Sequence, residues 1–122
     1  MSRVRHTIVI AVACVGLAGA IWARTGAQGG TRDVTIVGDQ FTFTPARIEV
    51  QQDDLVKVTF TAKDIAHSFA IDAYRIVKRA GAGQTVVFEF RADKPGTYTF
   101  YCNLSKDDRC RDMRGELVVR GR

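Results

Sequence analysis

The sequence predicts an all-β protein, a Greek-key β-sandwich of seven or eight short strands. From Asp33 onward, apolar and polar residues alternate with period two through most of the chain, which is typical of strands that bury one face. Glycine, proline and aspartate turn signals separate these stretches, and the chain has neither an internal repeat nor a long helical period. Short strands at such regular spacing favour a sandwich.

The expected strands follow one another with a turn signal at most of the boundaries. A Gly38-Asp39 turn separates the first two, and Pro45 interrupts the chain before the third, because proline cannot donate to a strand ladder. Residues 51–54 form a polar turn, residues 72–84 a longer excursion that ends in glycines, and residues 93–96 another turn. The strands are expected at residues 34–37, 41–43, 48–50, 56–61, 65–71, 86–91, 97–102 and 117–119.

Residues 1–27 predict a signal peptide or an N-terminal membrane anchor with a short tether. Arg3 and Arg5 precede an apolar stretch at residues 7–23, and small-x-small sites follow at 18–20 and 25–27, as in an export signal. The apolar stretch is at the short limit for crossing a bilayer, which favours cleavage over anchoring. Either outcome places a domain at residues 33–120 in the periplasm or another extracytoplasmic compartment.

The charge of the chain gives little support for nucleic-acid binding. Three of its 18 Lys and Arg residues, and none of its 13 acidic residues, lie before Ala27. The remaining part therefore carries 15 basic and 13 acidic groups, and no basic stripe interleaved with aromatic residues.

Four side chains predict a metal site with one copper ion: His67, Cys102, Cys110 and Met113. An imidazole, two thiols and a thioether are soft ligands that suit copper better than hard cations. By strand parity, His67 points inward together with Ile65, and Cys102 points inward at the end of its own strand. The loop at residues 103–112, in which Ser105 could cap a short helix, then returns Cys110 and Met113 to the same end of the sandwich.

A disulfide between Cys102 and Cys110 is the main alternative to that site. Cys14 falls within the apolar segment, so two cysteines remain in the domain, and an even pair in an oxidising compartment is often bridged. Cys110 fits either role equally well. In the same way, His67 could be a hydrogen-bonded core histidine, and Met113 could fill a gap in the core.

The chain resembles the cupredoxins at these residues, and among them the copper domains of cytochrome c oxidase subunit II and nitrous-oxide reductase. The resemblance covers residues 33–120. It rests on His67-Ser68-Phe69, on residues 95–98 leading into Cys102, and on Met113 leading into residues 115–119. It implies a cupredoxin sandwich with copper ligands in the loop.

The loop departs from the two-copper pattern of those relatives, Cys-x3-Cys-x3-His-x2-Met. Lys106 stands where that pattern has its second cysteine, and Cys110 stands where it has its histidine. One bridging thiolate and one imidazole cannot hold two coppers. The resemblance therefore implies at most a mononuclear site.

These observations predict an exported, monomeric copper protein for electron transfer or copper handling, working with a redox partner or a copper-transfer partner. The alternative is a metal-free structural or interaction domain closed by the disulfide. An enzyme ranks last, because four protein ligands leave the copper no open position and no nucleophile–base pair is visible.

Overall fold

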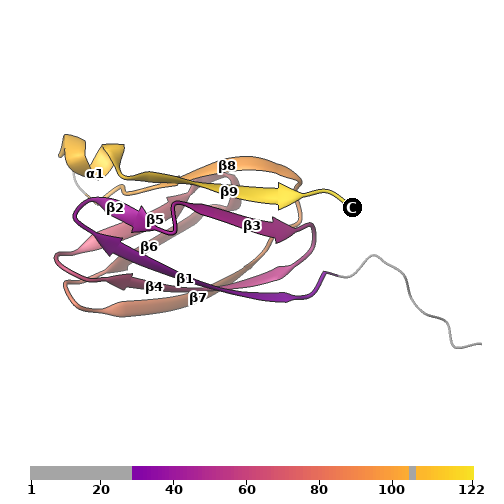
Figure 1. Cartoon of the computed structure of the whole chain (residues 1–122), viewed down its shortest axis with the longest axis horizontal. Helices are drawn as coiled ribbons and strands as arrows, with labels where there is room; N and C mark the ends of the chain where they lie inside the picture. Colours follow the sequence, from indigo (N-terminus) through magenta and orange to yellow (C-terminus); the bar gives the residue numbers. More distant parts are fainter. Residues whose placement is uncertain (1–28, 105–106) are drawn as a thin grey trace, which may run out of the picture.

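The computed structural model describes residues 29–104 and 107–122, which form two β-sheets packed face to face (Figure 1). One sheet has the strand order β2-β1-β4-β7, and the other has the order β3-β9-β8-β5-β6. A 3-10 turn, η1 (Asp72–Tyr74), and a short helix, α1 (Asp108–Asp112), complete the described part. The strands are β1 (Thr31–Asp39), β2 (Thr42–Thr44), β3 (Arg47–Gln51), β4 (Leu55–Ala62), β5 (His67–Ile71), β6 (Ile76–Ala80), β7 (Thr85–Arg91), β8 (Gly96–Tyr101) and β9 (Arg114–Arg120).

The predicted all-β sandwich is confirmed, with nine strands in the described residues. The additional strand is β6, which lies in the stretch expected to be an irregular excursion. Val77, Lys78 and Arg79 are all exposed on β6, which is an edge strand of its sheet. A strand at a sheet edge that buries little carries no alternating pattern, and this explains why it was missed.

The strand of His67 also starts later than the sequence predicts. β5 begins at His67 itself, and Ile65 lies in the preceding turn with 45% of its surface exposed. The expected inward orientation of Ile65 is therefore wrong. All five residues of β5 are buried, and β5 runs between β6 and β8 inside the sheet.

Phenylalanine rings from both sheets form the centre of the core. Phe69 on β5 lies 4.9 Å from Phe100 on β8 and 5.9 Å from Phe60 on β4, measured between ring centroids. Phe43 on β2 contacts Phe100 edge-on at 5.1 Å. Tilted and edge-to-face pairs of this kind stabilise a core beyond the area that they bury.

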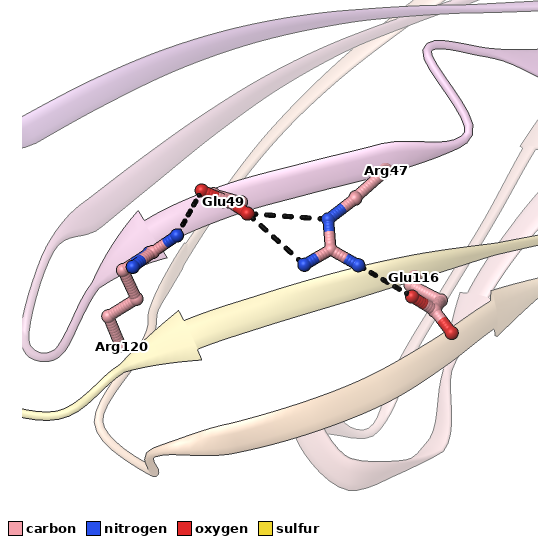
Figure 2. A network of polar contacts seen from close by, with 4 residues as sticks. All are labelled: Arg47, Glu49, Glu116 and Arg120. Atoms are coloured by element: carbon pink, nitrogen blue, oxygen red, sulfur yellow. Dashed lines mark hydrogen bonds and ion pairs between the residues drawn. The ribbon is translucent and has the colours of Figure 1, made fainter.

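A chain of exposed ion pairs joins β3 to β9 on the outer surface (Figure 2). Arg47 contacts Glu49 at 3.2 Å and Glu116 at 3.1 Å, and Arg120 contacts Glu49 at 2.8 Å. The hydrogen bond from Arg120, and then the one from Arg47, hold the pKa of Glu49 below its usual value. Exposed pairs contribute little stability, but these agree with the parallel register in which Arg47 lies opposite Glu116.

The predicted signal or anchor segment, residues 1–27, lies outside the described residues. Within residues 29–104 and 107–122, no helix is long and apolar enough to cross a membrane.

We expect Gly115→Ala to lower the free energy of unfolding by about 1–3 kcal/mol, the usual cost of overpacking a core. A Cβ at Gly115 would collide with the Phe100 ring and lie 2.7 Å from the carbonyl oxygen of Ala46. Gly121→Ala is the matched control, because a Cβ there would meet only Pro95 at 3.8 Å. Urea unfolding of both variants measures the difference, and equal stabilities would contradict the packing described here.

Candidate metal centre

His67 is held at the start of β5 by a carboxylate from the turn before it. The imidazole is 1% exposed, and its Nε2 lies 2.6 Å from Oδ1 of Asp64. This hydrogen bond, followed by one from the backbone of Ile65, lowers the pKa of Asp64 to about 2. Asp64 is therefore a carboxylate near neutral pH, and Nε2 donates the proton to it.

The other ring nitrogen of His67 has no partner. Nδ1 is buried and makes no hydrogen bond within the part of the chain that the structure describes. In a neutral imidazole that donates from Nε2, Nδ1 carries the lone pair. Most buried polar atoms are paired, and an exception calls for an explanation such as a bound ion.

Met113 shares the space around Gly38 with His67. Met113 is 1% exposed, and a Cβ built on Gly38 would lie 3.2 Å from its methyl carbon and 3.3 Å from Cδ2 of His67. A side chain at position 38 would therefore press on both groups. Figure 1 shows this end of the sandwich, where β1 turns into β2 beneath α1.

Cys102 and Cys110 form a disulfide, with their Cα atoms 5.2 Å apart. This is the alternative that the sequence left open. Each residue is 2% exposed, and backbone hydrogen bonds tie both to Met113: its N–H donates to the carbonyl of Cys110, and its carbonyl accepts from the N–H of Cys102. Both sulfurs and the thioether are thus held by residues at one end of the fold.

The loop that carries Cys110 contains the short helix α1. Its N-cap is Asp107, whose side chain accepts a hydrogen bond from the N–H of Arg109 at 2.9 Å. The residue expected to cap it, Ser105, lies outside the described residues, as does Lys106. Cys110 is the buried residue of this helix, so α1 turns the second cysteine inward toward Cys102.

Phe41 packs against His67, and Arg109 packs over Phe41. The Phe41 ring meets the imidazole edge-on at 5.7 Å, and the guanidinium carbon of Arg109 lies 4.6 Å from the centre of the Phe41 ring. Neither Phe41 nor Asp64 was predicted from the sequence as part of the site. The one available signal was the carboxylate three residues before a buried histidine.

The donor set changes with the state of the disulfide. Among the described residues, no three His, Cys, Asp or Glu side chains form a group that could hold a metal ion. With the disulfide closed, one imidazole nitrogen and one thioether remain, which is too few for a copper site. The two cysteine sulfurs are the further soft donors at this end, and the bridge occupies both.

Comparison with known proteins identifies the fold. A family model described as a cupredoxin-like domain matches residues 8–119. The metal-binding domain of the Cu(I)-exporting P-type ATPase CopA of Streptococcus pneumoniae D39 is similar, with a TM-score of 0.64 and 18% identity over 77% of this chain and 90% of that one. Auracyanin A, a "blue" copper protein from Chloroflexus aurantiacus, matches with a TM-score of 0.61 and 19% identity over 74% of this chain and 99% of that one.

A heme-copper terminal oxidase chain is also similar, with a TM-score of 0.64 and 19% identity over 72% of this chain. This chain spans 64% of the length of that oxidase chain. At these identities the likeness to solved structures shows the fold alone.

We expect Cys110→Ser to lower the free energy of unfolding of the oxidised protein by about 2–3 kcal/mol, the loop-entropy value for a bridge between residues eight apart. All proteins in this comparison carry Cys14→Ser, so that reductant acts on Cys102 and Cys110 alone. Urea unfolding with and without reductant measures the effect. A difference of the same size after reduction would show that the substitution acts on packing rather than on the bridge.

Proposed function

The chain belongs to the cupredoxin-like domain family, and from this premise we propose that it binds one copper ion as Cu(I) when the Cys102–Cys110 disulfide is reduced. The proposed role is copper handling outside the cytoplasm, controlled by the thiol state of this pair. The observation that carries the proposal is the buried Nδ1 of His67, which lacks a partner in the described residues and lies at the same end as three sulfur atoms.

The four proposed ligands are Nδ1 of His67 and the sulfurs of Cys102, Cys110 and Met113. Two thiolates and a thioether are soft donors that favour Cu(I). A bound copper could supply a one-electron couple, but a sulfur-rich set stabilises the reduced ion and resists cycling. For this reason we favour copper handling over electron transfer.

Asp64 supports the proposal as a positioning residue for His67. A metal-ligating histidine commonly donates its other N–H to a carboxylate, which fixes the tautomer and the ring orientation. The 2.6 Å bond from Nε2 to Asp64 has that form, and it leaves the Nδ1 lone pair for the metal.

A metal-free structural or interaction domain is the second candidate, and the closed disulfide favours it. In that case the bridge stabilises the end of the sandwich, and reduction should not create a metal site. The two candidates therefore differ in what the dithiol form binds.

We expect the reduced full chain to bind one Cu(I) and the oxidised chain to bind none, since a disulfide sulfur is a poor ligand. Competition with a chromophoric Cu(I) chelator under anaerobic conditions gives the stoichiometry and the affinity. Cys14→Ser is present throughout.

His67→Ala and Cys102→Ser should each weaken Cu(I) binding by more than tenfold, and Met113→Leu should weaken it less, because a thioether is a weaker donor than a thiolate. If the reduced chain does not bind Cu(I), the proposal is wrong and the metal-free domain is the remaining candidate. If His67→Ala binds Cu(I) as tightly as the parent protein, His67 is not a ligand.

We expect Asp64→Asn to weaken Cu(I) binding by about 10–100-fold, the usual effect of removing the carboxylate behind a ligating histidine. Asp39→Asn is the matched control: its carboxylate lies 3.8 Å from Lys63, and no contact with His67 is seen in the described residues. The same chelator competition measures both variants. Equal affinities would show that Asp64 does not position the imidazole for a metal.

A further inference from the structure

A groove of about 300 Å³ opens beside the disulfide, lined by Tyr101, Cys102, Asn103, Arg111 and Arg114. It lies between the end of β8, the helix α1 and the start of β9. Of the two bridged cysteines, Cys102 lines it, and 2% of its surface is exposed there. The volume is at the lower end of the range for small-molecule sites, so the groove fits a compound of a few residues better than a protein surface.

Two of the residues that line this groove are arginines. Arg111 and Arg114 are both exposed, and Nε of Arg114 donates to the carbonyl oxygen of Arg111 at 3.1 Å, which ties the two residues together. No acidic side chain is among the described residues that line the groove. Two arginines that line a groove next to Cys102 favour an anion, because guanidinium groups are planar donors that suit carboxylates.

We infer that this groove binds a small anionic thiol, such as a peptide thiol with free carboxylates, and directs its sulfur to Cys102. The inference rests on the proposed function, because it supplies the reduction that the copper site requires. Arg111 and Arg114 bind the carboxylates of the small thiol, and the thiolate of this molecule attacks Sγ of Cys102.

The thiol–disulfide exchange proceeds in two steps. The thiolate of the first small molecule attacks Sγ of Cys102, the Cys102–Cys110 bond breaks, and its electron pair passes to Sγ of Cys110, which leaves as a thiolate. A second small thiolate then attacks the small-molecule sulfur of the mixed disulfide and releases Cys102 as a thiolate. Two small thiols are oxidised to their disulfide, and the protein disulfide is reduced to a dithiol.

Ser68 is placed to stabilise Cys102 when the second step releases it as a thiolate. Its hydroxyl oxygen lies 3.6 Å from Sγ of Cys102, accepts from the N–H of Asn103 at 2.7 Å, and lies 2.8 Å from Oδ1 of Asn103. The hydroxyl can turn its proton from Asn103 toward a Cys102 thiolate. Asn103 lines the groove, so the groove and the sulfur share one hydrogen-bond network.

The test compares reduction of the full chain, with Cys14→Ser, by glutathione and by cysteamine. Glutathione is anionic and cysteamine is cationic, and each rate is normalised to the rate of the same thiol with an unstructured peptide disulfide. Release of protein thiols is followed without copper.

Arg111→Gln combined with Arg114→Gln should lower the rate of reduction by glutathione at least fivefold, and it should leave the rate of reduction by cysteamine unchanged or raise it. Arg120→Gln, at the opposite end of β9, is the control, and 0.5 M salt should reduce the preference for glutathione because exposed charges are screened.

Equal slowing of both thiols, or no slowing of glutathione, would overturn the inference. So would reduction by a protein dithiol that is faster than glutathione and insensitive to both arginine substitutions, since a protein reductant would then be the partner. The experiment measures thiol release alone. The inference about the groove can therefore be wrong while the reduced protein still binds Cu(I). Conversely, copper binding can fail while the groove still selects an anionic thiol.

Discussion

The contact between Phe69 and Phe100 fixes the position of the candidate metal centre. Their ring centroids lie 4.9 Å apart in the core, on strands β5 and β8 that run antiparallel. His67 precedes Phe69 by two residues, and Cys102 follows Phe100 by two. Since the strands run in opposite directions and side chains alternate, the imidazole and the sulfur both leave the aromatic core at the same end of the sandwich.

Sequence alone was sufficient for the fold class, because most strands bury one face and show it as alternation. It could not predict which strands pair. The parallel pairs of β1 with β4 and of β3 with β9 join segments separated by other strands, and their register depends on contacts that a local pattern does not contain. The edge strand β6 was missed, and Ile65 was misplaced, for a related reason: exposure at an edge or in a turn removes the signal on which parity relies.

Some features of the candidate site were likewise predictable from the sequence, and others were not. Burial of His67, Cys102 and Met113 followed from parity and position. The roles of Asp64 and Phe41 did not, because both come from turns that fold back over the imidazole; Phe41 has a left-handed φ of 56°, which no alternating pattern predicts. The pairing of Cys110 was also undecidable from spacing, since it depends on how the short helix α1 turns that residue toward Cys102.

Disulfide and copper would use the same two sulfurs, so the domain can hold only one of them at a time. The closed form leaves a buried imidazole nitrogen without a partner among the described residues, and such a group costs about 1–3 kcal/mol. An apolar side chain would avoid this cost if the bridge only stabilised the end of the sandwich. A histidine that is oriented by Asp64, and that keeps a buried Nδ1 without a partner in the described residues, is instead suited to the copper ion proposed to bind when the sulfurs are free. The thiol state of one pair would then decide whether this end of the fold is a structural bridge or a metal site.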